Sequence, residues 1–452
     1  MPGGARPTSR AETIFALSSG RGRAGVAVIR ISGPEAGAAL VRLTGGRLPA
    51  PRVARVAALR DPGDGSLLDR GLVVWFPGPA SFTGEDVAEL QVHGGPAVVA
   101  AIVGALARLP GLRPAEPGEF TRRAFERGRL DLTEAEGLAD LVAAETEAQR
   151  RQALRQLDGA LGELYEGWRR RLIDVVARLE AEIDFPEEGL PAGVGEGTRP
   201  VIEQLIAEVS GHLDDGRRGE RLRDGLYAVI VGAPNVGKSS LLNRLARREA
   251  AIVAAEPGTT RDVIEVHLDV AGYPLIVADT AGLREAAEPV ESEGVRRARD
   301  RAGRADLRIA LFDAREWPAR DKATAALVDE DSLVVVNKID LVGERHWPDP
   351  GEAGVWPVSA RTGAGLDAVE AGLAGEAEKR LAGAGAPCLT RARHRRALEE
   401  VVEHLSRALG APAPELAAED ARLAGRALGR ITGRVDVEDI LDVVFAEFCI
   451  GK

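Results

Sequence analysis

The chain has 452 residues, of which 45% are hydrophobic and 29% charged, with a formal net charge of −11. This length predicts two to four domains, and the acidic balance argues against a coat of nucleic acid while leaving room for a local basic patch. No apolar run approaches the ~20 residues of a membrane span, residues 1–10 hold no signal-peptide core, and two cysteines make no disulfide framework, so we expect a cytoplasmic protein without membrane contact.

The first 120 residues have the texture of a mixed α+β domain. Residues 24–31 and 72–76 are rich in Val and Ile, and residues 89–92 alternate polar and apolar, which predicts three strands. Residues 96–109 predict a helix that begins at a proline and ends before Pro110. We therefore predict an N-terminal domain over 1–120.

Helical periodicity follows this domain. Apolar residues recur at helical spacing through 130–142 and 154–179, which predicts long amphipathic helices whose stripes form a bundle core. The Gly-, Pro- and Glu-rich stretch 186–200 predicts a loop, and 201–213 predicts a further helix.

The rest of the chain first alternates between strand and helix patterns and then becomes helical again. Residues 216–380 alternate strand and helix, as in a doubly wound α/β sheet. Helical spacing returns over 391–409 and 421–448. The economical interpretation is one helical domain, 121–215 plus 381–452, interrupted by an inserted α/β domain; two separate bundles are the alternative.

A phosphate-binding loop lies at the start of the inserted domain. Residues 232–239 read Gly-Ala-Pro-Asn-Val-Gly-Lys-Ser and fit the pattern G-x-x-x-x-G-K-[ST]. An apolar strand-like run, 226–231, precedes the loop, and helical spacing over 240–245 follows it. Backbone N–H groups of such a loop cradle phosphates at a helix N-terminus. Lys238 is expected to reach the β- and γ-phosphates, and the Ser239 hydroxyl to ligate Mg²⁺.

Later motifs extend the nucleotide site. Gly258-Thr259-Thr260-Arg261-Asp262 offers a second hydroxyl, Thr260, for Mg²⁺. Asp279-Thr280-Ala281-Gly282 follows an apolar strand, so its aspartate can hold the metal through water and its glycine N–H can sense the γ-phosphate.

Two further motifs predict the base pocket. The carboxylate of Asn337-Lys338-Ile339-Asp340 can accept two hydrogen bonds from the N1 and N2 edge of guanine, which adenine lacks, so GTP is favoured. Ser359-Ala360-Arg361 completes the pocket. The predicted GTP-contacting residues are Asn235, Val236, Gly237, Lys238, Ser239, Ser240, Ala254, Ala255, Glu256, Pro257, Gly258, Thr259, Thr260, Asp279, Thr280, Ala281, Gly282, Asn337, Lys338, Asp340, Ser359, Ala360 and Arg361.

Five motifs in this order resemble a translation-factor-class GTPase domain, a P-loop (Ras-like) G domain. Where Ras-like enzymes have a water-orienting glutamine, this chain has Leu283, which cannot orient water. The acidic residues Glu285, Glu288 and Glu291 lie just downstream, and the sequence alone does not choose among them.

Asn235 is either filler of the loop or a ligand. The loop Gly-x-Pro-Asn-x-Gly-Lys-Ser resembles the TrmE–Era–EngA group, which includes the MnmE family. That resemblance implies K⁺ beside the phosphates in place of an arginine finger. Its ligands would be Asn235 with groups of Ala254, Glu256 and Thr259.

The flanking segments resemble the MnmE family of tRNA-modification GTPases from end to end. The matching stretches are residues 22–33, 81–86 (Ser-Phe-Thr-Gly-Glu-Asp), 89–91, 93–96, 117–120, 123–125, 130–132 and the final Cys-Ile-Gly-Lys. The resemblance implies an N-terminal domain that dimerises and binds a tetrahydrofolate derivative, 5-formyl- or methylene-tetrahydrofolate. The implied folate contacts are Arg30, Glu89, Arg129 (often lysine in the family) and Lys452.

The resemblance also implies catalytic roles and partners. Glu291 would orient the water, Lys238 and Arg284 would serve hydrolysis with Arg261, and G domains would pair when GTP is bound. The partner would be MnmG, an FAD and NADH protein, and the product a carboxymethylaminomethyl- or aminomethyl-type group on C5 of the wobble uridine of certain tRNAs. Cys449 can be a nucleophile, a metal ligand or filler, and the resemblance marks it as important.

Two basic clusters, 169–171 and 391–396, can contact tRNA phosphates or can be ordinary helix-surface charge. A regulatory GTPase in ribosome assembly is the rival function. The absence of a KH-type Gly-x-x-Gly module after residue 380, together with the folate-like domain and Cys449, favours tRNA modification. A purely structural scaffold leaves the intact nucleotide motifs unexplained.

Overall fold

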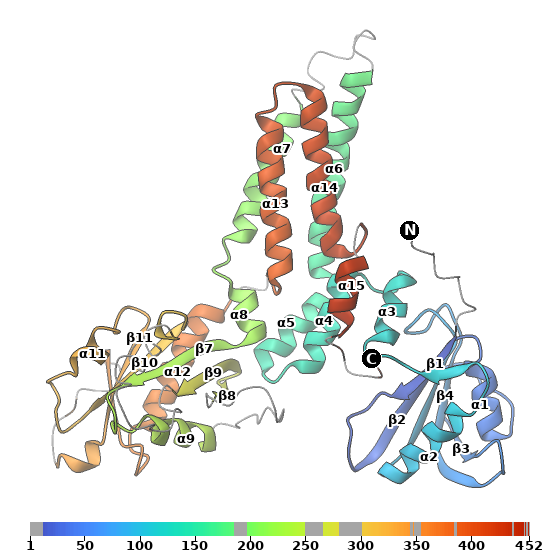
Figure 1. Ribbon diagram of the computed structural model, residues 1–452, viewed down its shortest axis with the longest axis horizontal. Helices are drawn as coiled ribbons and strands as arrows, with labels where there is room; N and C mark the ends of the chain where they lie inside the picture. Colours follow the sequence, from blue (N-terminus) through green and yellow to red (C-terminus); the bar gives the residue numbers. More distant parts are fainter. Residues whose placement is uncertain are drawn as a thin grey trace, which may run out of the picture. The chain divides into compact units, whose positions relative to one another are not determined.

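The computed structural model describes residues 12–184, 197–248, 265–279, 301–343, 347, 354–383, 387–435, 438–446, 448 and 451. The chain divides into two compact units (Figure 1). One unit combines Met1–Ala139, Leu157–Arg169 and Leu428–Lys452, and the other combines Asp140–Gln156 and Arg170–Ala427. The predicted multidomain class is confirmed, while the four domain boundaries stay a prediction.

The first unit is built on a six-stranded sheet in the described part of the chain, in the order β3-β4-β5-β2-β1-β6. Its strands are β1 (Thr13–Leu17), β2 (Ala24–Ser32), β3 (Arg55–Arg60), β4 (Leu67–Phe76), β5 (Val87–Gly94) and β6 (Leu112–Pro114). The β1–β6 pair is parallel and the others are antiparallel. Helices α1 (Ala36–Thr44) and α2 (Pro96–Ala107) contribute Leu40, Leu43, Ile102 and Leu106 to the core that covers this sheet.

Short helices complete this unit. Helix α3 (Glu119–Glu126) follows the sheet, and α4 (Leu132–Ala143) packs Leu132 and Ala135 against Val444 and Phe445 of α15 (Glu438–Ala446). A Cβ at Gly118 would overlap the carbonyl oxygen of Phe445 at 2.5 Å, so the last helix packs directly on the turn before α3. Distant parts of the sequence therefore share one core.

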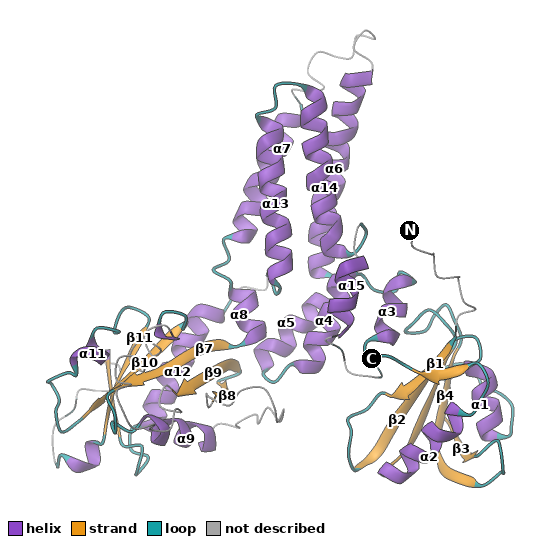
Figure 2. Ribbon diagram, in the orientation of Figure 1, coloured by secondary structure: helices purple, strands orange, loops and turns teal. Residues whose placement is uncertain are grey.

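The helical texture predicted for 121–215 and 381–452 is present (Figure 2). Its long elements are α5 (Glu147–Leu157), α6 (Ala160–Asp184), α7 (Thr198–Leu213), α13 (Ala392–Leu409) and α14 (Pro414–Thr432). Helices α7 and α13 pack along each other, with Leu205 and Val209 buried on one and Val401 and Leu405 on the other. Among the described residues, no helix is long and apolar enough to cross a membrane.

Three predicted helix bounds were wrong. The stripe 154–179 is broken because Gly159 has φ 90°, a conformation that ends α5 and lets α6 begin. Gly433, with φ 83°, likewise divides the predicted helix 421–448 into α14 and α15. The helix predicted from 201 begins at Thr198, because Pro200 fits the first helical turn, where no N–H partner is needed.

The second unit holds the predicted α/β sheet, whose described strands run in the order β12-β11-β10-β7-β9-β8. They are β7 (Leu226–Gly232), β8 (Glu265–Val270), β9 (Tyr273–Asp279), β10 (Leu307–Asp313), β11 (Ser332–Asn337) and β12 (Val355–Val358). All pairs are parallel except β8–β9. The connecting elements are α8 (Arg218–Asp224), α9 (Lys238–Arg248), α11 (Lys322–Ala325), the 3₁₀ turn η1 (Ile339–Leu341) and α12 (Leu366–Leu381).

Both faces of this sheet are buried, as an apolar parallel sheet requires. Ala228 and Ile230 face the core formed with α9 and α12, and Val229 and Val231 face the opposite core. Because the strands are parallel, the carboxyl ends of β7, β9, β10, β11 and β12 meet at one edge. Motif residues Gly232, Asp279 and Asn337 end three of those strands.

Candidate functional site

The phosphate loop joins β7 to α9. Gly237 has φ 107°, and a Cβ there would overlap the side-chain nitrogen of Asn337. Glycine is therefore required twice, by the backbone conformation and by the neighbouring amide. The predicted order of strand, glycine loop and helix is present, so the N–H groups at the start of α9 face the loop in the arrangement that suits a phosphate.

Lys238 lies across the loop. Its Nζ donates to the carbonyl oxygens of Gly232 (2.9 Å) and Ala233 (3.0 Å), and its side chain is buried. Burial lowers the pKa of Lys238, and nearby Asp279 opposes the shift. The ammonium is thus held by neutral dipoles in a partly desolvated place, where an added negative charge interacts strongly with it.

Ser239 and Asp279 form a pair of oxygen donors. The Ser239 hydroxyl donates to Oδ2 of Asp279 at 2.5 Å, and Asp279 is 1% exposed at the end of β9. Hydroxyl and carboxylate oxygens are the ligands that Mg²⁺ prefers, usually directly or through water. The residues present therefore fit the predicted magnesium site.

Asn337 ties the phosphate loop to the base loop. Its buried side chain donates from Nδ2 to the carbonyl of Val236 (2.9 Å) and accepts at Oδ1 from the N–H of Ala360 (3.0 Å). Arg244 of α9 adds a second tie by donating to the carbonyl oxygens of Ala360 (3.1 Å) and Arg361 (2.7 Å).

Asp340 presents its carboxylate beside this loop. Its Oδ1 accepts from the Ser359 hydroxyl (2.5 Å), and its Oδ2 accepts from Nε of Arg361 (3.0 Å). These contacts, first the Ser359 hydroxyl, lower the pKa of Asp340. The group is therefore an anionic acceptor near neutral pH, as recognition of the guanine N1 and N2 donors requires.

Lys338 reaches back to the phosphate loop. Its Nζ donates to the Asn235 carbonyl (2.6 Å) and pairs with Asp313 at 2.8 Å. Asp313 also accepts two bonds from Arg315, and these contacts hold its pKa well below its usual range. We did not predict a role for Asp313. Its position at the end of the apolar strand β10 could have placed it at the sheet edge where the motif residues lie.

The predicted folate contacts Arg30 and Glu89 lie opposite each other on β2 and β5. The guanidinium donates to one carboxylate oxygen from Nε (3.0 Å) and Nη2 (2.9 Å). It also lies over the rings of Phe82 (5.1 Å to the centroid) and Phe120 (5.8 Å). A carboxylate paired with a guanidinium that itself lies over two aromatic rings can bind a flat heterocycle that carries N–H donors.

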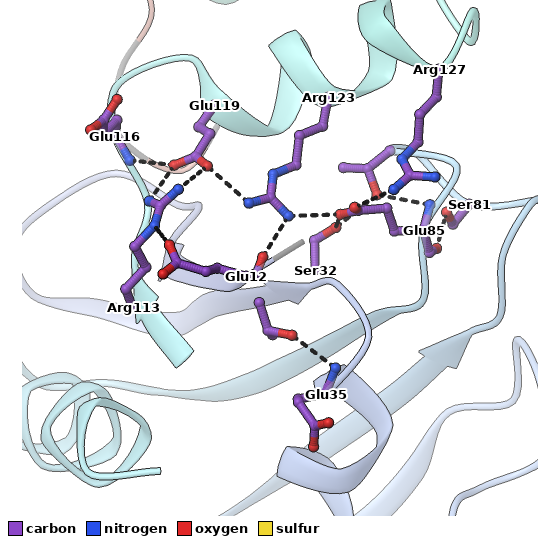
Figure 3. Close-up of polar contacts among 12 residues, drawn as sticks. Glu12, Ser32, Glu35, Ser81, Glu85, Arg113, Glu116, Glu119, Arg123 and Arg127 are labelled. Carbon is purple, nitrogen blue, oxygen red and sulfur yellow. Dashed lines mark hydrogen bonds and ion pairs between the residues drawn. The ribbon is translucent and has the colours of Figure 1, made fainter. Parts of the chain in front are cut away.

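A network around Glu85 holds both ring-bearing segments in place (Figure 3). The buried carboxylate accepts from Arg123 (2.9 Å), Arg127 (2.7 Å) and the Ser32 hydroxyl (2.9 Å). Arg123 also binds Glu119 of the same helix. The loop that carries Phe82 is thereby fixed to the helix that carries Phe120.

The C-terminal tail returns to the first strand. Ser18, which follows β1, donates its hydroxyl to the Gly451 carbonyl at 2.8 Å. Gly451 has φ 102°, and a Cβ there would overlap the carbonyl oxygen of Leu17. The structure therefore brings the end of the chain to the folded N-terminal sheet.

Comparisons with known proteins decide the family. Two family models match the chain, "GTP-binding protein TrmE N-terminus" over residues 13–129 and "MnmE helical domain" over residues 132–449. A tRNA modification GTPase MnmE of Rhodospirillum rubrum is 59% identical and covers 98% of this chain and 99% of its own length. The relative of the same name from Paramagnetospirillum magneticum is 60% identical and covers 98% of this chain and 100% of its own length.

The chain belongs to the MnmE family.

Among solved structures, the G domain of the T. maritima FeoB iron transporter is similar at 24% identity, covering 34% of this chain and 98% of that one, with a TM-score of 0.26.

Several residues named in the sequence analysis lie outside the described residues. They are Ala254, Ala255, Glu256, Pro257, Gly258, Thr259, Thr260, Arg261, Thr280, Ala281, Gly282, Leu283, Arg284, Glu285, Glu288, Glu291, Cys449 and Lys452. Their predicted roles stay predictions. Of the remaining named residues, Asn235 has φ 62° at the tip of the phosphate loop, Ser240 is exposed in the first turn of α9, and Arg129 is exposed after α3.

The two basic clusters of this MnmE-family chain are engaged in ion pairs. Four of their arginines pair with carboxylates: Arg169–Glu166 (3.2 Å), Arg171–Glu208 (2.7 Å), Arg391–Asp140 (2.8 Å) and Arg395–Asp215 (2.7 Å). For these four side chains the pairing favours the structural alternative over contact with tRNA phosphates.

Proposed function

We propose that this chain is a GTP hydrolase that acts in tRNA modification. The observation that carries the proposal is the join at one sheet edge, where Asn337 links the phosphate loop at Val236 to the base loop at Ala360. Lys238, the Ser239–Asp279 pair and the Asp340 carboxylate flank that join. Each has the chemistry that one part of GTP requires.

The residues divide the work on GTP by position. Asp340 accepts hydrogen bonds from guanine. It lies two residues beyond Lys338, whose Nζ reaches the phosphate loop at the Asn235 carbonyl. Lys238 neutralises phosphoryl oxygens from a partly desolvated place, where its effect on developing charge exceeds that in water. Ser239 and Thr260 would hold Mg²⁺, which bridges and neutralises the phosphates when bound.

Hydrolysis in this proposal depends on K⁺ and on Glu291. Leu283 cannot orient the attacking water, and the resemblance to the MnmE family gives that role to Glu291, with Arg284 nearby in sequence. K⁺ would be held by Asn235 with groups of Ala254, Glu256 and Thr259. We expect faster GTP hydrolysis in K⁺ than in Na⁺ at matched ionic strength, and equal rates would remove the cation from the mechanism. Glu291→Ala should keep GTP binding and lose most turnover.

The N-terminal sheet supplies the one-carbon donor site in this proposal. Arg30 and Glu89, flanked by two aromatic rings, support a tetrahydrofolate derivative, with Arg129 and Lys452 for its acidic tail. The active assembly would be a homodimer through this domain, joined by MnmG. Calorimetry with 5-formyltetrahydrofolate tests the site. We expect wild-type protein to bind with measurable heat and Arg30→Ala to abolish that binding. The absence of heat with wild-type protein would contradict the folate proposal.

The deciding experiment is mass spectrometry of wobble uridines in tRNA from cells that lack this protein. We expect loss of the C5 aminomethyl-type group and its return on complementation. Unchanged uridines together with a ribosome-assembly defect would favour the rival function instead.

A further inference from the structure

A cavity of about 190 Å³ lies in the second unit, where the chain enters and leaves the nucleotide-binding sheet. Its walls come from α5, the turn between α7 and α8, α8 itself, the end of α12 and the segment before α13. The side chains that line the cavity include Arg155, Asp215, Arg218, Leu222, Leu381 and Cys388. None of them belongs to the sites described above.

Two arginines on this wall form no ion pair with a described carboxylate. Arg155 donates from Nη2 to the amide oxygen of Gln152 (3.0 Å), and its Nε is buried without a hydrogen-bond partner. Arg218 donates to the Ala382 carbonyl (3.2 Å). Neither has a carboxylate partner in the described part of the chain, unlike Arg395 close by, which pairs with Asp215. Both guanidinium groups are partly buried, and the Nε of Arg155 is fully enclosed, so a counter-charge in the cavity would stabilise them and an anion is favoured.

Asp215 adds a second requirement. Its Oδ1 accepts from Arg395 (2.7 Å) and from the Arg217 N–H (2.9 Å), while its Oδ2 is buried without a partner in the described residues. A buried carboxylate oxygen costs free energy unless a donor reaches it. The cavity therefore offers unused donors on two arginines and one unused acceptor.

The remaining wall carries the exposed carboxylate of Asp214 and the imidazole of His212, whose pKa burial lowers, and is otherwise apolar or neutral. Leu222 and Leu381 are buried, and burial raises the pKa of the Cys388 thiol to about 11, so that sulfur carries no charge near neutral pH. A thiol in this state is a poor nucleophile but still reports access to the cavity.

We propose that this cavity binds a small protonated oxyanion of the phosphate class, with Arg155 and Arg218 donating to its charged oxygens and Asp215 accepting from its hydroxyl. Phosphate near neutral pH carries both unprotonated oxygens and an O–H group. Sulfate matches it in size and charge but has no proton to donate. The unused acceptor of Asp215 therefore selects phosphate over sulfate, because sulfate would place two acceptors against each other.

The test follows Cys388 labelling in the full chain. Wild-type protein, saturated with GDP and Mg²⁺ to fill the phosphate loop, is treated with N-ethylmaleimide in potassium phosphate or potassium sulfate at equal ionic strength. Peptide mass spectrometry then separates Cys388 from Cys449. We expect saturable protection of Cys388 by phosphate and at least tenfold weaker protection by sulfate. A phosphomonoester such as glycerol phosphate, titrated in parallel, shows whether the site takes free phosphate or a phosphorylated metabolite.

Matched variants locate the anion. Arg155→Gln should weaken phosphate protection at least tenfold. Arg151→Gln, one turn earlier on α5, makes the same charge change at an exposed side chain that pairs with Glu147 (2.7 Å), and it should leave protection unchanged. Equal protection by phosphate and sulfate in wild-type protein overturns the proposal without any variant. Protection that survives Arg155→Gln would place the anion elsewhere.

Discussion

Replacing Asn337 by alanine removes the amide that ties the phosphate loop to the base loop. The change deletes two hydrogen bonds, Nδ2 to the Val236 carbonyl and the Ala360 N–H to Oδ1. Asn337 is 2% exposed, so water does not readily replace either bond. Each main-chain group left without a partner costs about 1–3 kcal/mol, or about 2–6 kcal/mol together.

The assay separates binding from stability. The loss of about 2–6 kcal/mol should appear in the free energy of unfolding, while titration with a fluorescent GDP analogue should show more than about threefold weaker affinity because the two loops are no longer held in register. Urea unfolding should show a lower midpoint for the nucleotide domain. Asn243→Ala on α9 is the control, because that asparagine is exposed and its loss should change stability by less than about 0.5 kcal/mol.

One result would refute this reasoning. If Asn337→Ala binds the analogue within threefold of wild type and unfolds at the same urea concentration, the amide does not hold the two loops together.

Three further changes are predicted. Asp340→Asn should reverse base preference from GTP to XTP, because the amide can donate to the xanthine O2 where the carboxylate accepted from guanine N2; unchanged preference in a competition assay would contradict the base-pocket assignment. Glu85→Ala should lower the free energy of unfolding of the N-terminal unit by about 1–3 kcal/mol, since it removes the acceptor of the buried Ser32 hydroxyl and of the largely buried Arg123, and a shift under about 0.5 kcal/mol by calorimetry would count against the network. Gly451→Ala should weaken 5-formyltetrahydrofolate binding at least tenfold by pushing the tail off Leu17, whereas Gly167→Ala, which has open space around it, should not.

The sequence predicted elements well where local pattern and burial agree. The strands predicted over 24–31 and 226–231 each fall one residue short of β2 and β7. These runs are apolar and β-branched, and both faces or one full face are buried, so propensity and packing point the same way.

Helix ends were predicted less well because single residues decide them. Gly159 and Gly433 interrupt stripes whose apolar spacing continues across the break, and periodicity does not register a positive φ. Contacts within the sites could not be predicted, because they join residues that are far apart in sequence. Asp313 and Lys338 are 25 residues apart in sequence, and the link between Ser18 and Gly451 spans almost the whole chain. The order of strands in the sheet and the contact of the C-terminal segment with β1 bring these pairs together, and local sequence patterns predict neither.

The packing of α7 on α13 imposes an order on biosynthesis. The end of α7 at Leu213 and the start of α13 at Ala392 are separated by 178 intervening residues. At about 5–20 residues per second, a ribosome needs roughly 10–40 s to deliver the second helix. During that interval the apolar side chains of Leu205 and Val209 have emerged without the surface that later buries them. The helical partners can therefore meet only after the whole chain of the inserted nucleotide domain has been synthesised.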